Sequence, residues 1–334
     1  MDRSFNGITF SPSRLFVAGT VSLAIVFAPV AAVYVRQYSI STPAAIAVYL
    51  AFTLLLILSV VPAAKSTRTI DRTAPRYLPF LFVLIWCTPY LIYAAGTGDF
   101  RWTALIKLLL IAAFPVAIYG RFPPRNAHAF SWQDASVAVF LIGAVLSRRL
   151  TGIWNVPTNL DFLNRLFLIT VAAWSWTFIR PVPELGYSFR VSREVVRQAA
   201  INFAFFAAIA MPAGLAMHFT RWNPRWPGAV QFLLNYLEIF LFIAVLEELF
   251  FRGFLQNLLS KTLGSWVAGQ TLVSLLFGMF HILHAPFPNW RYVALASVAG
   301  WFYGSAYRIS GSLMASALLH AGVDTFWRTW FSAT

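Results

Sequence analysis

Eleven apolar runs follow one another along this chain of 334 residues, and most are long enough to cross a lipid bilayer as helices. A membrane-spanning helix needs about 20 apolar residues. The runs cover residues 15–35, 43–64, 77–95, 103–119, 135–146, 166–179, 199–219, 232–251, 265–283, 292–307 and 312–330. Because runs 135–146 and 166–179 are short, the sequence predicts an all-α, polytopic transmembrane helix bundle of about 8–11 spans.

The composition excludes a soluble globular domain. Hydrophobic residues make up 59% of the chain and charged residues only 11%, whereas soluble domains carry about 25% charged residues. The net charge of +14 is spread over many short loops, as expected where loops concentrate Lys and Arg beside a membrane. We therefore expect the lipid bilayer, and no nucleic acid, as a partner. The single cysteine, Cys87, lies in an apolar run and is interpreted as a buried hydrophobic residue.

Ionisable groups within the apolar runs, or at their ends, lie almost entirely after residue 200. Charged groups at membrane depth are costly, and they usually face a bundle interior where they serve catalysis or transport. Function is therefore expected in the C-terminal half. The groups are Glu238, Glu247, Glu248, Asp324, His218, His281, His284 and His320.

Two adjacent glutamates form the densest cluster. Glu248 and Arg252 are four residues apart, so they share a helix face and can pair. Glu247 lies about 100° around the helix and faces other neighbours. A structural ion pair would explain Glu248 and Arg252 alone. It leaves Glu247 without a local partner and available as a base.

Histidines follow on the next spans. His281 and His284 are three residues apart, and His320 and Asp324 are four apart, so each pair shares a helix face. A carboxylate bonded to an imidazole fixes its tautomer. A carboxylate base, an imidazole and oxyanion donors are the groups that activate water. Glu247, His281 and His320 could equally bind zinc, although the His-Glu-x-x-His spacing of zincins is absent.

Three motifs occur in order: Glu247-Glu248-x-x-x-Arg252, Phe277-x-x-x-His281 and His320-x-x-x-Asp324. In this the sequence resembles the CPBP family of intramembrane proteases, which includes the type II CAAX prenyl endopeptidases and bacteriocin-processing, Abi-like proteins. The resemblance implies that Glu247 and His281 activate water, that His320 and Asp324 hold the oxyanion, and that Glu248 and Arg252 support the site. The family is described both as metal-dependent and as using a glutamate without metal, so zinc is left open as a cofactor.

One position departs from the prenyl endopeptidase type, which has Asn where this chain has Asp324. An ionised Asp cannot donate a hydrogen bond to an oxyanion. Asp324 therefore either is protonated by burial or orients His320, and we favour the second interpretation.

We predict two domains, an accessory transmembrane module over residues 1–164 and a CPBP-like protease domain over residues 165–334. The expected function is an intramembrane endopeptidase that hydrolyses a peptide bond of a membrane-associated peptide or protein, in a multi-pass protein of a bacterial inner membrane. Two alternatives stay open. One is a catalytically silent membrane scaffold or immunity protein, and the other is a proton-coupled transporter, since transmembrane Glu, His and Asp also build proton relays.

Overall fold

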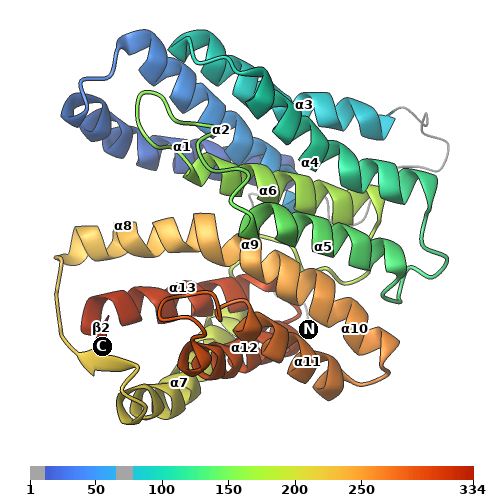
Figure 1. Cartoon of the computed structure of the whole chain (residues 1–334), viewed down its shortest axis with the longest axis vertical. Helices are drawn as coiled ribbons and strands as arrows, with labels where there is room; N and C mark the ends of the chain where they lie inside the picture. The colour runs from blue at the N-terminus through green and yellow to red at the C-terminus, as the bar shows by residue number, and fades with distance from the viewer. Residues whose placement is uncertain (1–11, 65–77) are drawn as a thin grey trace, which may run out of the picture.

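The computed structural model describes residues 12–64 and 78–334, and this part of the chain is almost entirely helical (Figure 1). The N-terminal helices are α1 (Pro12–Gln37), α2 (Thr42–Ala64), α3 (Leu78–Thr97), α4 (Trp102–Arg121), α5 (Trp132–Leu146) and α6 (Phe162–Trp174), which continues as the π-helix η1 (Ser175–Ile179). The C-terminal elements are α7 (Arg193–Ala216), α8 (Ala229–Ile239), η2 (Phe240–Ala244), α9 (Val245–Glu248), η3 (Leu249–Gln256), α10 (Asn257–Thr262), α11 (Trp266–Met279), α12 (Trp290–Ser310) and α13 (Leu313–Trp330). Two short strands, β1 (Thr220–Trp222) and β2 (Phe331–Ala333), pair antiparallel.

Every predicted apolar run corresponds to a helix, so the prediction of an all-α membrane bundle is confirmed. Within the described residues, six helical segments are long and apolar enough to cross a membrane. They are Thr42–Ala64, Pro79–Thr97, Trp102–Arg121, Phe162–Ile179, Arg193–Ala216 and Ala229–Thr262. Shorter apolar helices include Trp132–Leu146 and Trp266–Met279. This multi-pass architecture makes the chain an integral membrane protein.

Serine side chains begin several of the helices. Ser131 accepts a hydrogen bond from the Asp134 backbone amide while the Asp134 carboxylate accepts one from the Ser131 amide, which is a capping box. Ser192, Ser265 and Ser312 cap α7, α11 and α13 in the simpler way. These caps satisfy amide groups that the first helical turn leaves without partners.

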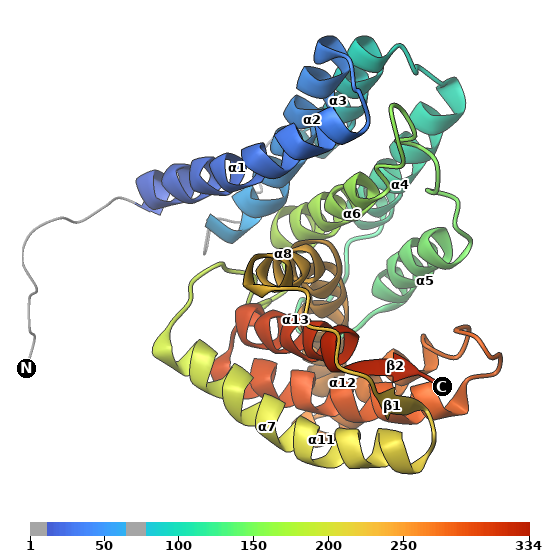
Figure 2. The ribbon, with the colours of Figure 1, turned by 90° about the vertical axis from the view of Figure 1, so that its left-hand side faces the viewer.

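The helices form two groups on either side of α6 and the long segment Ala229–Thr262, as Figures 1 and 2 show. On one side α2 packs against α6, and α1 and α3 pack against α2. On the other side α13 packs along α8, η2 and α9, and α7, α11 and α12 complete the bundle. Because α6 also contacts η2, α9 and η3, the N-terminal helices reach the elements that carry the two glutamates.

The segment Ala229–Thr262 is one helical span interrupted by π-helical turns. The four residues of α9 lie between η2 and η3. In η2 and η3 the backbone hydrogen bonds join residues five apart. π-Helical turns are frequent at functional sites, and here they flank Glu247 and Glu248 directly.

Glycines allow α11 and α12 to approach closely. A Cβ at Gly278 would lie 2.0 Å from the Ser297 Oγ and 2.5 Å from the Val293 carbonyl oxygen, and one at Gly300 would lie 3.2 Å from the Ser274 Cα. Close approach through small residues is typical of membrane helix pairs. The Gly300 carbonyl oxygen on α12 accepts a hydrogen bond from Arg252.

A buried ion pair ties the α4–α5 region to the chain that follows η1. The Arg180 guanidinium contacts both Asp134 carboxylate oxygens, at 2.9 and 3.1 Å, and donates to the Ala127 and Ala129 carbonyl oxygens. The Tyr119 hydroxyl donates to the same carboxylate. Because both charged side chains are buried and multiply bonded, the pair locks these segments together.

Candidate active site

Glu248 and Arg252 form a fully buried ion pair, as their spacing predicted. The Glu248 Oε2 and the Arg252 Nε are 3.1 Å apart, and Arg252 also donates to the Gly300 carbonyl oxygen at 3.2 Å. The guanidinium carbon lies 4.7 Å from the centre of the Phe277 ring, which adds a cation–π interaction. The pair is therefore a rigid anchor and does not face the solvent.

Glu248 also fixes His320. The Glu248 Oε1 is 2.9 Å from the His320 Nδ1. Since an ionised carboxylate can only accept, Nδ1 carries the proton and donates. The imidazole stacks on Tyr303, with ring centres 4.6 Å apart, and meets the edge of Phe277 at 5.9 Å. These contacts orient the remaining ring nitrogen, Nε2.

The Nε2 atom of His320 faces two further carboxylates. It lies 4.0 Å from the Glu247 Oε2 and 3.7 Å from the Asp324 Oδ2. Both distances exceed a good hydrogen bond, so neither carboxylate holds the ring as Glu248 does. Both side chains are 35% exposed, whereas His320 is 4% exposed. The two adjacent glutamates thus differ sharply, with Glu248 sealed inside and Glu247 accessible.

The hydrogen bond that fixes His320 therefore comes from Glu248, a link that the spacing of residues in the sequence did not suggest. We expected Asp324 to orient this ring. The structure places the Asp324 Oδ2 3.7 Å from Nε2, at ion-pair distance. The cause is the packing of α13 along α9, because a contact between helices leaves no trace in the spacing of residues along one helix.

His281 lies just beyond α11, which ends at Met279 and not at residue 283 as predicted. The chain tightens there to bonds between residues i and i+3, such as His281 N–H to the Gly278 carbonyl. The His281 Nδ1 donates to the Phe277 carbonyl oxygen at 2.8 Å, which leaves its Nε2 free. Phe277 contacts both His281 and His320, with ring centres 5.0 and 5.9 Å away.

The loop after α11 brings a second histidine close. The rings of His281 and His284 stack with centres 5.7 Å apart. Partial desolvation lowers the pKa of His284, His281 lowers it further, and Glu247 raises it. His284 is thus near enough to Glu247 to interact with it electrostatically, at the open side of the site.

The structure adds two residues that sequence reasoning missed. Tyr303 stacks on His320 and lies 5.5 Å from the Arg252 guanidinium. Arg165 on α6 interacts electrostatically with Glu247 and donates to the Phe242 carbonyl oxygen at 3.3 Å. Nothing in the sequence singles out Tyr303 among the aromatic residues. Arg165 stands at the edge of a short apolar run, where a loop position explains it equally well.

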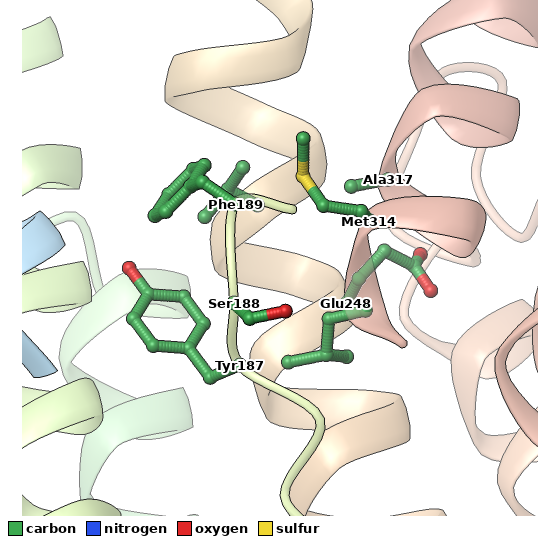
Figure 3. A pocket seen from close by; sticks show the side chains of 8 residues that line it. Tyr187, Ser188, Phe189, Glu248, Met314 and Ala317 are labelled. Carbon is green, nitrogen blue, oxygen red and sulfur yellow. The ribbon is translucent and has the colours of Figure 1, made fainter. Parts of the chain in front are cut away.

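A small pocket adjoins Glu248, between the segment Tyr187–Phe189 and α13. Figure 3 shows the segment Tyr187–Phe189 passing close to Glu248, with Met314 and Ala317 of α13 above it. Its volume of about 10 Å³ offers room for about one water molecule. The pocket beside Glu248 is therefore too small to take a peptide.

The donors considered for zinc do not form a metal site in the described part of the chain. Within residues 12–64 and 78–334, no three His, Cys, Asp or Glu side chains are placed so that together they could hold a metal ion. Glu247, His281 and His320, the set considered for zinc, thus do not converge as ligands.

A comparison with protein families finds one similarity, in the C-terminal half of the chain. Residues 229–326 match the family model "Type II CAAX prenyl endopeptidase Rce1-like". The chain is thus similar to this family over 98 of its 334 residues. The match runs from α8 into α13 and contains all three motifs. It confirms the resemblance to the CPBP and CAAX protease family that the three motifs indicated.

No curated protein and no solved structure matches the chain. The family match begins at Ala229. It therefore does not test the domain boundary predicted at residue 165. The contacts of α6 with η2, α9 and η3 show that the matched segment and the N-terminal helices pack directly together.

Proposed function

We propose that the chain is an intramembrane endopeptidase in which Glu247 is the general base and His320 stabilises the oxyanion. The observation that carries this proposal is the contrast between the two glutamates. Glu248 is buried and holds His320 and Arg252, while Glu247 is accessible and makes no hydrogen bond within the described residues. A base that must bind water and a substrate carbonyl needs this freedom.

In the proposed step, Glu247 takes a proton from water, and the resulting hydroxide oxygen attacks the scissile carbonyl carbon. The His320 Nε2–H then donates to the oxyanion, because Nδ1 is committed to Glu248 and the carboxylates around the ring favour the imidazolium. When the tetrahedral intermediate collapses, the C–N bond breaks. Glu247 passes its proton to the leaving amine.

Asp324 and His281 take supporting roles. Asp324 lies near the Nε2 of His320 and stabilises its positive charge. The free Nε2 of His281 is available to bind water or the leaving group on the open side. The substrate is proposed to be a membrane-associated peptide or protein, as the family description suggests, and a bacterial inner membrane is the proposed location.

The first experiment measures cleavage of a library of lipid-embedded peptides by the purified protein in liposomes. Wild type is compared with Glu247→Gln, His281→Ala and His320→Ala, each with and without a strong chelator. We expect cleavage by wild type that resists the chelator and falls by about 10²–10⁴ in Glu247→Gln, as for loss of a general base.

Glu194→Gln is a matched control, because Glu194 is an exposed glutamate on α7 paired with Arg197 and is remote from the three motifs in sequence. Equal cleavage by wild type and Glu247→Gln would overturn the mechanism. Absence of cleavage by folded wild type would favour a silent scaffold. Loss of activity with chelator, restored by zinc, would replace the glutamate mechanism with a metal-dependent one.

A further inference from the structure

Four exposed arginines gather at one end of the C-terminal bundle, where α7 and α13 end and α8 and α12 begin. Elsewhere in the described residues Arg180, Arg197 and Arg252 each pair with a carboxylate. The segments 218–230, 285–292 and 326–334, which carry the four arginines, contain no Asp or Glu. This end of the molecule therefore bears positive charge that no acidic side chain neutralises. The four residues are Arg221, Arg225, Arg291 and Arg328.

The two-stranded ribbon holds three of these arginines together. Arg221 on β1 lies opposite Ser332 on β2, and its Nε donates to the Ser332 Oγ at 3.0 Å. The Arg225 backbone amide donates to the Thr329 carbonyl oxygen at 2.8 Å, next to Arg328 in the chain. Figure 2 shows the ribbon at one end of the bundle, beside the C-terminus. The three basic side chains thus belong to one continuous surface.

The fourth arginine joins this surface from α12. Arg291 donates to the His218 carbonyl oxygen at 3.3 Å, just before β1. The neighbouring Phe219 packs on Tyr292 and on Trp327, with ring centres 5.2 and 6.0 Å away. The beginning of α12 is therefore fixed against the ribbon and the end of α13.

Tryptophans lie among the arginines. The rings of Trp222 and Trp330 stack with centres 5.7 Å apart, and Trp226 stacks on Trp330 at 6.3 Å. Trp222, Trp226 and Trp290 are each more than half exposed. Tryptophan is enriched at the headgroup level of a bilayer, where its apolar ring and its polar N–H both find partners. The exposed rings thus indicate the level of the lipid headgroups at this end of the bundle.

We propose that this basic aromatic surface binds the phosphate groups of anionic lipids; it consists of Arg221, Trp222, Arg225, Trp226, Arg291 and Arg328. Guanidinium groups match phosphate oxygens in charge and in geometry. Clustered basic residues beside membrane helices attract anionic headgroups. Lipid is favoured over an acidic protein segment because the surface lies at the ends of four helices of a membrane bundle, among rings that prefer the headgroup level.

The basic aromatic surface adjoins the candidate active site through Tyr292. The Tyr292 ring centre lies 4.6 Å from that of His281 and 5.0 Å from that of His284. A lipid bound at this surface is thus close to the loop after α11. The inference does not depend on the proposed function, because binding a headgroup requires no catalysis.

The first experiment measures lipid affinity by native mass spectrometry of the full chain in neutral detergent. We expect phosphatidylglycerol to bind more tightly than phosphatidylcholine or inorganic phosphate. Each basic side chain near an anionic headgroup adds about fivefold in affinity. The triple variant Arg221→Gln, Arg225→Gln, Arg328→Gln should therefore lose about 100-fold. The same three positions changed to Lys should stay within about fivefold of wild type, which separates loss of charge from loss of folding.

The second experiment locates the lipid by hydrogen exchange in phosphatidylcholine nanodiscs with and without phosphatidylglycerol. We expect the anionic lipid to slow exchange in segments 218–228 and 326–334 of wild type, and the Gln triple variant to lose this effect. The matched control is Arg190→Gln, Arg193→Gln, Arg308→Gln. It removes the same charge from before α7 and from the opposite ends of α7 and α12, and it should keep the slowing in both segments.

Four results would overturn the proposal. One is equal phosphatidylglycerol affinity in wild type and the Gln triple variant. Another is equal slowing with and without phosphatidylglycerol, which would indicate plain contact with the bilayer. Inorganic phosphate that binds as tightly as the lipid would indicate a site for free anions. A soluble Glu-rich peptide that protects the two segments more strongly than phosphatidylglycerol would make the surface a protein docking site.

Discussion

Replacing each of the adjacent glutamates by glutamine is expected to produce opposite defects. Glu248→Gln removes the negative charge from a side chain that is 0% exposed and leaves Arg252, 1% exposed, without its counter-charge. Breaking a buried pair from one side costs about 3–5 kcal/mol. The Arg252 Nε and Nη1 have no hydrogen-bond partner in the described part of the chain, so no other group takes over this role.

Glu247→Gln is expected to leave stability nearly unchanged. The side chain is 35% exposed and approaches His320 only to 4.0 Å, so the change in the free energy of unfolding should stay below about 1 kcal/mol. Activity should instead fall by about 10²–10⁴, the contribution of a general base.

The assay is reversible denaturation of both variants in mixed micelles, with peptide cleavage measured on the same preparations. The expected pattern is a destabilised Glu248→Gln protein and a stable, inactive Glu247→Gln protein. If Glu248→Gln is as stable as wild type, the buried pair does not anchor the site. If Glu247→Gln is the less stable variant, the assignment of the two roles is reversed.

Three further predictions follow from the packing. Arg180→Met is expected to destabilise the protein by about 3–5 kcal/mol because it leaves the buried Asp134 without its counter-charge, and adding Asp134→Leu should recover only part of this loss in the same unfolding assay, because Tyr119 and the Ser131 cap also lose their acceptor. Tyr303→Leu removes the ring stacked on His320 and should lower kcat by up to about 10²-fold through misplacement with little change in KM; a changed KM alone would contradict this. Gly278→Ala places a Cβ 2.0 Å from the Ser297 Oγ and should lower stability by about 1–3 kcal/mol, and unchanged thermal unfolding in detergent would show that α11 and α12 can separate.

The helices could be predicted from the sequence because apolar length alone decides whether a segment can span a bilayer. Their limits could not always be predicted. The run that ends at Phe251 continues as a helix to Thr262, because Arg252, which ends the apolar run, is buried against Glu248 and Phe277. The charge of Arg252 predicts the end of the span, but this charge is neutralised by Glu248 inside the bundle and the helix continues.

The site could be predicted as a set of residues but not as a set of contacts. The Glu248–Arg252 pair lies within one helix, so its spacing revealed it. The Glu248–His320 bond joins residues 72 positions apart, and neither it nor the stacking of Tyr303 has a periodic signature. The sequence also shows no sign of the apolar cavity of about 640 Å³ that Glu238 lines. Its walls come from α1, α2 and α8, which meet only in the folded chain.

The π-helical segment η2 has a consequence for how this span tolerates a change in its length. A π turn holds one more residue than the α turn it replaces, so the stretch Phe240–Ala244 can lose or gain a residue and still close as a helix. Such a change would rotate Glu238 about the helix axis relative to Glu247. The hydrogen bond between Glu248 and His320 of α13 would stay in place. The face that Glu238 presents would then change while the contacts among Glu248, Arg252 and His320 stayed intact, so this span can vary in length and keep its buried anchor.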